Sequence, residues 1–459
     1  MGYKNGILLC FLIICAFFTI SCVVAADMSD NLTEVDVADL TTSDGTQVME
    51  QQDNKEIIAE TDEGTFTALQ KKINNASDGT TITLENDYKY DEGFSKNGIS
   101  ISKSLTIDGN GHILNGLSKS RIFKIYSGEI TFKNIKFING RAIYDDDSRT
   151  GDGGAILQDY TYGDKLIFSG CTFTNNIADD SGGAVAFKEG TFTNCIFTNN
   201  KANGNMGNGY GGALVQENMV SGVDKLVNIR NCVFTNNVAK KGGGAIRAVC
   251  AITTINGCTF NSNKATEGGA IFSRQPLTIT SSKFNTNHAS GDGGAIYYGG
   301  TECEIKSSTF TKNVAGKTGG AVFNKVIIEN GKKYAAKIVK CTFTDNKAKS
   351  NKDVCGGTIQ NCVFKTTKTT LTLKTVKVKK SLKKLVLTAV LKYGKTPLKI
   401  KKITFKFNGK AYNAKTNKKG IAKVTIKKKV LKKLKVGKKV KYQAKYGKLI
   451  VKKTVKIKK

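Results

Sequence analysis

Tryptophan is absent from the 459-residue sequence, and histidine and proline occur only twice each. Two histidines supply too few ligands for a His-rich metal centre. Acidic residues and arginine are absent from residues 366–459, which contain 34 lysines, whereas residues 1–365 carry 37 basic and 37 acidic groups. The formal charge of +34 therefore comes entirely from the C-terminal segment, and this distribution fits a cytosolic enzyme poorly. The length allows more than one core to be buried.

Long hydrophobic runs are absent beyond the N-terminus. Lys4 precedes an apolar run from Ile7 to Ile20, and small residues at Val24-Ala25-Ala26 suit a signal peptidase. We predict a secretory signal peptide over residues 1–26. A lipid anchor on Cys22 is the alternative, although Thr19-Ile20-Ser21 is a weak lipobox. No later segment is apolar enough to span a bilayer, so we predict a secreted protein held at the cell surface or wall by surface contact.

Residues 27–63 contain 12 acidic residues and one lysine. Such a segment cannot bury enough apolar surface to offset the entropy of the chain. We predict a disordered acidic leader.

A repeated phrase, C-x-F-x-x-N-x-A followed by G-G-A-[IVL], dominates the middle of the chain. Its asparagines follow a phenylalanine by three residues and are Asn176, Asn200, Asn237, Asn263, Asn287, Asn313 and Asn346. Glycine pairs end at Gly154, Gly183, Gly212, Gly244, Gly269, Gly294, Gly320 and Gly357.

One copy of the repeat, from Gly293, breaks into three short strand-like pieces (AIYY, ECEI and STFT). Helical repeats need longer segments of 3.6-residue periodicity, and propeller blades need about 40 residues. We therefore predict an all-β chain with a right-handed parallel β-helix over residues 64–365. We expect the Cys and Phe of each repeat, which are two residues apart in a strand, to point inward. The repeat Asn should form a ladder at the following corner. The Gly-Gly pairs should lie at corners that need positive φ or a close approach of the backbone.

An amphipathic helix is predicted before the first coil. Phe66, Leu69, Ile73 and Ala76 recur at helical spacing in TFTALQKKINNA. Because an open end of a β-helix exposes unpaired strand edges, we expect this helix to cap the N-terminal end.

The segments TFTALQKKINNASDGTTITLENDYKY and SLTIDGNGHIL, together with the repeats, resemble methanogen adhesin-like surface proteins built on a pectate-lyase-type β-helix. The FxxN and GGAI elements are also similar to repeats of chlamydial polymorphic outer membrane proteins. The resemblance covers residues 60–365 and implies a β-helix at the cell surface. The tail resembles the Ig-like modules of the same archaeal family.

Nine cysteines remain after signal cleavage, and no spacing among them suits zinc. Six occupy the position two before the repeat phenylalanine, where Ser282 and Ser308 replace cysteine in two copies. We predict an interior ladder of small side chains whose disulfide state the sequence leaves open, because stacked coils point neighbouring Cβ atoms the same way. The resemblance to methanogen proteins implies an anoxic exterior in which thiols persist.

Acidic residues precede several glycine pairs: Asp152, Asp180, Glu267 and Asp292. With Asp145, Asp146 and Asp147 near the first, a calcium site is one interpretation and solvated turn residues are the default. No other cofactor is expected. Paired carboxylates suited to a glycosidase do not stand out, and neither His112 nor His288 occupies a catalytic position, so we predict a protein that is not an enzyme.

Insertions lengthen several coils, at residues 157–164, 203–210, 216–225 and 324–336. Insertions of one class emerge on one face of a solenoid. Tyr160, Tyr162 and Tyr210 are therefore predicted as exposed aromatic residues of a carbohydrate-binding face, with functionless loops as the alternative.

Residues 366–459 alternate apolar residues with lysine in six or seven short segments separated by turns such as Asn408-Gly409. This pattern predicts an antiparallel, Ig-like β-sandwich with lysine outside. Like charges repel, so we expect an anionic partner. The secretory signal and the lack of arginine argue against nucleic acid and favour an acidic wall polymer; solubility in a saline habitat is the alternative.

The sequence thus predicts an adhesin-like protein whose β-helix binds glycans or proteins of a host or neighbouring cell and whose basic module holds it to the wall. A β-helical polysaccharide lyase or glycosidase and a structural envelope protein without a ligand are the alternatives. The ligand and the oligomeric state are not specified by the sequence.

Overall fold

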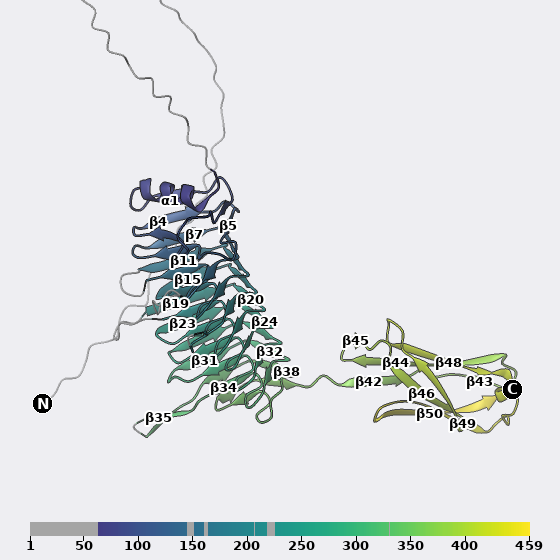
Figure 1. Ribbon diagram of the computed structural model, residues 1–459. Helices are drawn as coiled ribbons and strands as arrows, with labels where there is room; N and C mark the ends of the chain where they lie inside the picture. Colours follow the sequence, from purple (N-terminus) through teal and green to yellow (C-terminus); the bar gives the residue numbers. More distant parts are fainter. Residues whose placement is uncertain (1–62, 145–150, 160–163, 206, 218–224, 330) are drawn as a thin grey trace, which may run out of the picture. The chain divides into compact units, whose positions relative to one another are not determined.

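The computed structural model describes residues 63–144, 151–159, 164–205, 207–217, 225–329 and 331–459. The predicted signal peptide and the predicted leader, apart from Glu63, lie outside these residues. From the first helix to about residue 365, the chain winds into stacked coils whose strands pair in parallel (Figure 1). The predicted right-handed parallel β-helix is confirmed.

Three long sheets run along the β-helix. The first, which we call the GGA sheet, contains the strands that follow the glycine pairs. Its order is β3 (Ile99–Ile101), β6 (Phe123–Ile125), β10 (Ile156–Gln158), β14 (Val185–Phe187), β18 (Leu214–Gln216), β22 (Ile246–Ala248), β26 (Ile271–Ser273), β30 (Ile296–Tyr298), β34 (Val322–Asn324) and β39 (Val354–Cys355).

The linking sheet follows the GGA sheet along each coil. Its order is β1 (Thr81–Thr83), β4 (Leu105–Asp108), β7 (Ile130–Lys133), β11 (Lys165–Ser169), β15 (Glu189–Thr193), β19 (Lys225–Arg230), β23 (Ala251–Asn256), β27 (Leu277–Thr280), β31 (Cys303–Lys306), β37 (Lys337–Val339) and β40 (Thr358–Gln360).

The Phe sheet carries the repeat phenylalanines. Its order is β2 (Tyr88–Lys89), β5 (Ile113–Asn115), β8 (Lys136–Ile138), β12 (Thr172–Thr174), β16 (Ile196–Thr198), β20 (Val233–Thr235), β24 (Thr259–Asn261), β28 (Lys283–Asn285), β32 (Thr309–Thr311), β38 (Thr342–Thr344) and β41 (Val363–Lys365).

A fourth, two-residue strand adds to the predicted three in many coils. These strands pair as β9 (Arg141–Ala142), β13 (Ile177–Ala178), β17 (Lys201–Ala202), β21 (Val238–Ala239), β25 (Lys264–Ala265), β29 (His288–Ala289) and β33 (Val314–Ala315). A hairpin of β35 (Ile327–Glu329) and β36 (Lys332–Tyr334) leaves the coil within the predicted insertion at 324–336. The repeat alanine lies on the fourth strand, where its small side chain is buried.

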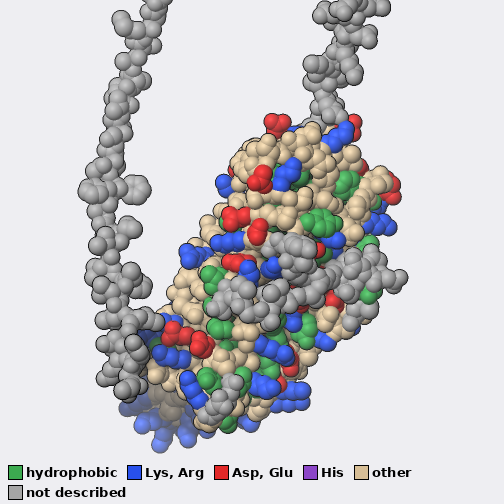
Figure 2. All heavy atoms as spheres, turned by 90° about the vertical axis from the view of Figure 1, so that its left-hand side faces the viewer, with side chains coloured by type: hydrophobic (Ala, Val, Ile, Leu, Met, Phe, Trp, Pro, Cys, Tyr) green, Lys and Arg blue, Asp and Glu red, His purple; other side chains and the backbone are tan. Residues whose placement is uncertain are grey.

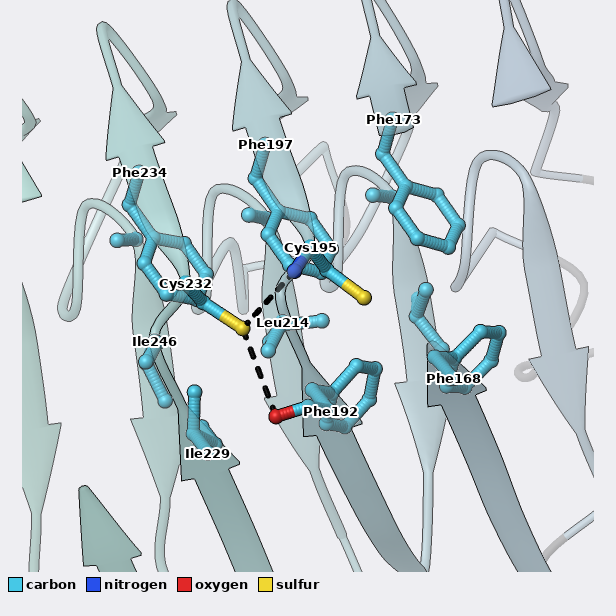
Figure 3. Close-up of a cluster of buried hydrophobic side chains, with 14 of the residues drawn as sticks. Phe168, Phe173, Phe192, Cys195, Phe197, Leu214, Ile229, Cys232, Phe234 and Ile246 are labelled. Atoms are coloured by element: carbon cyan, nitrogen blue, oxygen red, sulfur yellow. Dashed lines mark hydrogen bonds between the residues drawn. The ribbon is translucent and has the colours of Figure 1, made fainter. Parts of the chain in front are cut away.

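The interior is built from identical side chains stacked coil on coil (Figure 3). From Phe137 to Phe364, the rings of the Phe sheet lie 4.7–5.0 Å apart between centroids. Cys195 and Cys232 lie beside this stack, and both are fully buried. The prediction that Cys and Phe both point inward is confirmed, because residues two apart in a strand share a face.

The repeat asparagines form the predicted ladder at the corner after the Phe sheet. In one rung, the Asn200 side-chain amide donates to Asn237 Oδ1 (3.0 Å) and to the Phe173 carbonyl (3.0 Å). The backbone N–H of Asn200 also donates to Asn237 Oδ1 (3.0 Å). Each asparagine therefore satisfies backbone groups that the turn takes out of the sheet.

Both predicted reasons for the glycine pairs apply at the same corner. Gly268 has φ of 58°, and a Cβ on Gly269 would lie 2.2 Å from the carbonyl oxygen of Gly294 in the next coil. For the last pair, Gly356-Gly357, the predicted place before a strand is wrong, because the pair follows β39. Asn351, with φ of 47°, provides the left-handed residue of that corner.

Helix α1 (Phe66–Asn75) caps the N-terminal end as predicted. Thr65 Oγ1 accepts from the N–H of Ala68 (3.1 Å), and Phe66, Leu69 and Ile73 are buried. The side-chain amide of Gln70 pairs with the backbone of β3 as a neighbouring strand would. Its Oε1 accepts from the Ser100 N–H (2.7 Å) and its Nε2 donates to the Ser100 carbonyl (3.0 Å). The cap therefore satisfies polar groups of the exposed edge as well as covering the core.

The lysine-rich module has its own core and two sheets. One sheet contains β42 (Thr369–Leu373), β44 (Lys384–Tyr393), β45 (Thr396–Pro397) and β48 (Ile421–Lys427); the other runs β43 (Val378–Lys379), β50 (Leu449–Lys458), β49 (Lys439–Tyr446), β46 (Lys402–Phe407) and β47 (Lys410–Lys415). A short helix, α2 (Lys428–Leu431), follows β48. Residues 371–378 divide between the two sheets, and β43 pairs with β50 in parallel, so the module is not purely antiparallel as predicted.

Among the described residues, neither α1 nor α2 is long and apolar enough to cross a membrane.

Candidate functional site

The interior cysteines are structural. All nine cysteines of the described residues are free thiols. The N–H of Cys195 donates to Cys232 Sγ (3.4 Å), and in a later coil the N–H of Cys258 donates to Ser282 Oγ (3.2 Å). Serine replaces cysteine because either side chain accepts this bond. Burial raises the pKa of the Cys341 thiol to about 11, so this thiol is a poor nucleophile at neutral pH.

Two of the predicted acidic residues come together on successive coils. Asp152 Oδ1 accepts from the N–H of Ser181 (2.8 Å), and the side chains of Asp152 and Asp180 are only 5% and 4% exposed. Burial, with Glu217 and Asp180 nearby, raises the pKa of Asp152 to about 8. The interpretation of these residues as solvated turn residues is therefore wrong for this pair, because the corner closes over them.

The other predicted acidic residues lie farther along the same corner. Glu267 and Asp292 are half-buried, and Asp292 Oδ1 accepts from the N–H of Thr318 (2.9 Å). The predicted participants Asp145, Asp146 and Asp147 lie outside the described residues. Within the described residues, no group of three or more His, Cys, Asp or Glu side chains is placed to hold a metal ion.

The two histidines lie apart from these carboxylates. His112 Nδ1 lies 3.1 Å from Asp87 Oδ1 near the N-terminal end, and the N–H of Ile113 lowers the pKa of Asp87. His288 is exposed on β29, between Lys264 and Val314 of the neighbouring coils.

Tyr210 is the predicted aromatic residue that the structure describes; Tyr160 and Tyr162 lie outside the described residues. Tyr210 is half-buried instead of fully exposed. The Arg247 guanidinium lies 4.4 Å from its ring centroid, Lys241 Nζ lies 5.6 Å away and the Phe272 ring 5.8 Å away. The phenol ring is therefore one part of a larger cationic and aromatic surface.

That surface follows the outward positions of the GGA sheet. The middle residues of β22, β26, β30 and β34 are in register, and we call them the outer row: Arg247, Phe272, Tyr297 and Phe323. The rings of Phe272 and Tyr297 stack at 4.9 Å, and those of Tyr297 and Phe323 at 5.1 Å. Leu157, Ala186 and Val215 continue the same register in earlier coils as a small buried cluster.

Charged groups of both signs surround the outer row. Arg247 pairs with Glu217, and the Arg274 guanidinium lies 5.2 Å from the centroid of Phe272. Burial, followed by the negative charge of Glu267, raises the pKa of Tyr297. Figure 2 shows acidic and basic side chains interspersed over one face of the β-helix, unlike the uniformly basic C-terminal module. The half-buried rings of Tyr297 and Phe323, with the arginines and carboxylates around the outer row, thus form a combination suited to polar ligands with apolar patches.

The insertion at residues 203–210 indicates Tyr210 but not the outer row, whose residues occupy the variable position after G-G-A-[IVL]. Alternation alone was the available signal, because a side chain between two inward residues of a strand must point outward.

Comparison with known families supports the repeat assignment. Five segments, residues 170–188, 231–249, 257–274, 281–299 and 307–325, match the Chlamydia polymorphic membrane protein repeat. This repeat occurs in surface-exposed, adhesin-like outer membrane proteins, and no catalytic family matches. Comparisons with curated proteins and with solved structures give no significant match. The chain is therefore similar to surface adhesins through its repeated coils.

Proposed function

We propose that the protein is a cell-surface adhesin whose β-helix binds glycans or proteins of another surface and whose lysine-rich module attaches it to an anionic wall polymer. The outer row carries the first part of this proposal. Tyr297 and Phe323 point away from the core and are half-buried, whereas Phe272 is only 2% exposed and supports the Tyr297 ring from the neighbouring coil. Aromatic edges beside Arg247 and Arg274 suit the alternating apolar and hydroxyl surfaces of sugars.

The lysine excess carries the second part. Residues 366–459 contain no acidic side chain that could neutralise the lysines, so attraction to an external polyanion is favoured. Two sheets around a shared core support the proposed Ig-like character of this module.

A polysaccharide lyase or glycosidase is the competing function, and Asp152 and Asp180 are the residues that favour it. A carboxyl group with a raised pKa beside a second carboxylate is a typical acid-base pair. Their burial argues against this role, because each side chain is at most 5% exposed and a polymer does not reach it.

Binding of the purified protein to an array of glycans, run beside a reducing-sugar release assay, tests the proposal. We expect binding without sugar release. The double variant Tyr297→Ser/Phe323→Ser should lose binding while keeping its circular dichroism spectrum and melting temperature. Tyr126→Ala is the matched control, because Tyr126 is 40% exposed near the N-terminal coils.

Each alternative predicts a different result. Sugar release that Asp152→Asn or Asp180→Asn abolishes would establish the enzyme. A wild-type protein that binds neither glycans nor proteins of intact cells would indicate a structural envelope component.

A further inference from the structure

The lysines of the C-terminal module are divided unequally between its two sheets. Inward residues of both sheets form one core that includes Leu387, Ile426, Phe405 and Val440. Figure 1 shows β46, β49 and β50 side by side, and β42, β44 and β48 grouped in the other sheet. The alternation of buried and exposed residues along each strand then shows which lysines point outward.

On the five-stranded sheet, lysine fills most outward positions of the three central strands. We call these residues the lysine face: Lys406 on β46, Lys439, Lys441 and Lys445 on β49, and Lys452 and Lys456 on β50. All six are exposed. Lys439 is directly opposite Lys456, and Gln443 lies between Lys406 and Lys452 in one cross-strand row. Adjacent strands are about 4.8 Å apart and alternate residues about 6.8 Å, so these ammonium groups can approach one another closely.

The four-stranded sheet presents a different outer surface. The central outward pairs on β44 and β48 include Val386 opposite Thr425 and Val390 opposite Ile421. Val386 is 38% exposed. The outward lysines of β44 and β48, which have ten and seven residues, are only four: Lys384, Lys392, Lys423 and Lys427. The two outer surfaces therefore differ in charge density although they belong to one small module.

A hollow of about 380 Å³ lies in the lysine face. Its lining consists of Lys406, Lys441, Lys452 and Lys453 together with Gly409, Tyr442, Gln443 and Thr454. The lysines supply four cations, of which Lys453 donates to Thr375 Oγ1 (2.6 Å), while the Gln443 amide and the Thr454 hydroxyl supply neutral donors and acceptors. No ion pair joins these lysines to a carboxylate in the described part of the chain. Lysine is a point charge without the fork geometry of arginine, which suits isolated sulfate, phosphate or carboxylate groups on a flexible chain.

We infer that an anionic polysaccharide docks across the lysine face of the five-stranded sheet and seats one charged group in the hollow between Lys406, Lys441 and Lys452. This inference rests on the proposed attachment to an anionic polymer and assigns it to one face. The absence of arginine, the main base-reading residue, from residues 366–459 favours a polysaccharide over a nucleic acid, and Gln443 and Thr454 add hydrogen bonds for sugar hydroxyls beside the cations. The four-stranded sheet takes no part in the contact.

Two triple variants of the full-length protein with equal changes of charge test the assignment. Lys406→Gln/Lys441→Gln/Lys452→Gln removes three charges from the lysine face, and Lys384→Gln/Lys423→Gln/Lys427→Gln removes three from the other sheet. Each is titrated with dextran sulfate at several salt concentrations, with uncharged dextran as the ligand control. Melting curves accompany the titrations, and both variants should fold, because removing exposed like charges lowers repulsion.

The first triple variant should bind dextran sulfate at least ten-fold more weakly than wild type and show a shallower dependence of affinity on salt, because fewer counterions are released. The second should change affinity less than three-fold. Equal losses in the two variants would overturn the inference and leave net charge alone as the cause of binding. Duplex DNA that displaces dextran sulfate at equal or lower charge concentration would also overturn the assignment to a polysaccharide. Failure of the wild-type protein to bind dextran sulfate would instead refute the proposed attachment of the module to an anionic polymer.

Discussion

The two asparagines in each Phe-Thr-Asn-Asn phrase have different structural tasks. Asn236 has φ of 56° and takes the left-handed turn, whereas Asn237 is buried in the ladder. Ser262 and Lys312 occupy the position of Asn236 in other coils with φ of 56° and 55°. The turn position therefore requires a conformation that several residues tolerate, and the ladder position requires one amide with both a donor and an acceptor.

Replacing Asn237 with alanine should lower the free energy of unfolding by about 3 kcal/mol or more, because the N–H of Asn200 and the carbonyl of Phe197 lose their partner inside the protein. Asn236→Ser should cost less than about 1 kcal/mol, since serine already occupies this turn in another coil. Denaturant unfolding of the two variants measures the difference. Similar losses would show that the ladder bonds do not distinguish the two positions.

Asp152 should make the stability of the β-helix depend on pH. Its folded pKa of about 8 exceeds the usual value near 3.9, because burial, Glu217 and Asp180 outweigh Arg121 and the Ser181 N–H. The folded state therefore holds an extra proton, and stability falls as the pH rises from about 4 to 8.

Asp152→Asn keeps an acceptor for Ser181 and removes the titration. The variant should match wild type near pH 4 and be more stable by over about 1 kcal/mol at pH 8. Melting temperatures recorded across this range measure the effect. A wild-type curve that stays parallel to that of the variant would contradict the assignment of the titration to Asp152.

At the scale of elements, each coil is stable because its neighbours complete its core. The Phe260 ring lies 4.9 Å from Phe234 and 4.7 Å from Phe284, whereas the adjacent Thr259 is half-buried on the outer side of β24. Phe260→Asp places a charge inside this stack and should abolish the cooperative melting of several coils. Thr259→Asp should change the melting temperature little, because Lys283 is its partner on β28. Equal losses of melting temperature in the two variants would mean that the assignment of inward and outward residues on β24 is wrong.

The repeated elements could be predicted from the sequence because each interior position recurs with the same residue type. Phe, Cys and Asn ladders, the glycine corners and the cap helix all follow from side-chain periodicity. The exception is informative: Gly356-Gly357 matches the motif but follows β39, since Asn351 already provides the left-handed corner. The outer row could not be predicted from the repeat, because packing of the interior does not restrict which residues face outward.

At the scale of the whole molecule, strand order is the property that alternation does not specify. The sequence predicts that lysine points outward along each strand of the C-terminal module, but pairing determines which lysines share a face. β49 and β50 form a local hairpin, but β46 joins β49 through contacts distant in sequence, such as Thr404 with Lys445. The burial of Asp152 and Asp180 likewise depends on coils about 28 residues apart closing over one corner. Charge density and carboxylate burial therefore emerge from tertiary structure alone.

The two cores are separate sets of residues, one in the β-helix and one in the lysine-rich module, so removal of the second should leave the first intact. Deleting residues 366–459 should release into the medium a β-helix that remains folded, with a β-type circular dichroism spectrum and a cooperative melting transition. Washing cells with 1 M salt should release the full-length protein without detergent, because the Debye length falls from about 10 Å at 0.1 M to about 3 Å. Immunoblots of the cell and medium fractions measure both results. If the truncated protein stays on the cells, or if 1 M salt leaves the full-length protein bound, the anchor lies outside the module. A lipid on Cys22 then becomes the first candidate, because it would hold the chain through apolar contacts that salt does not weaken.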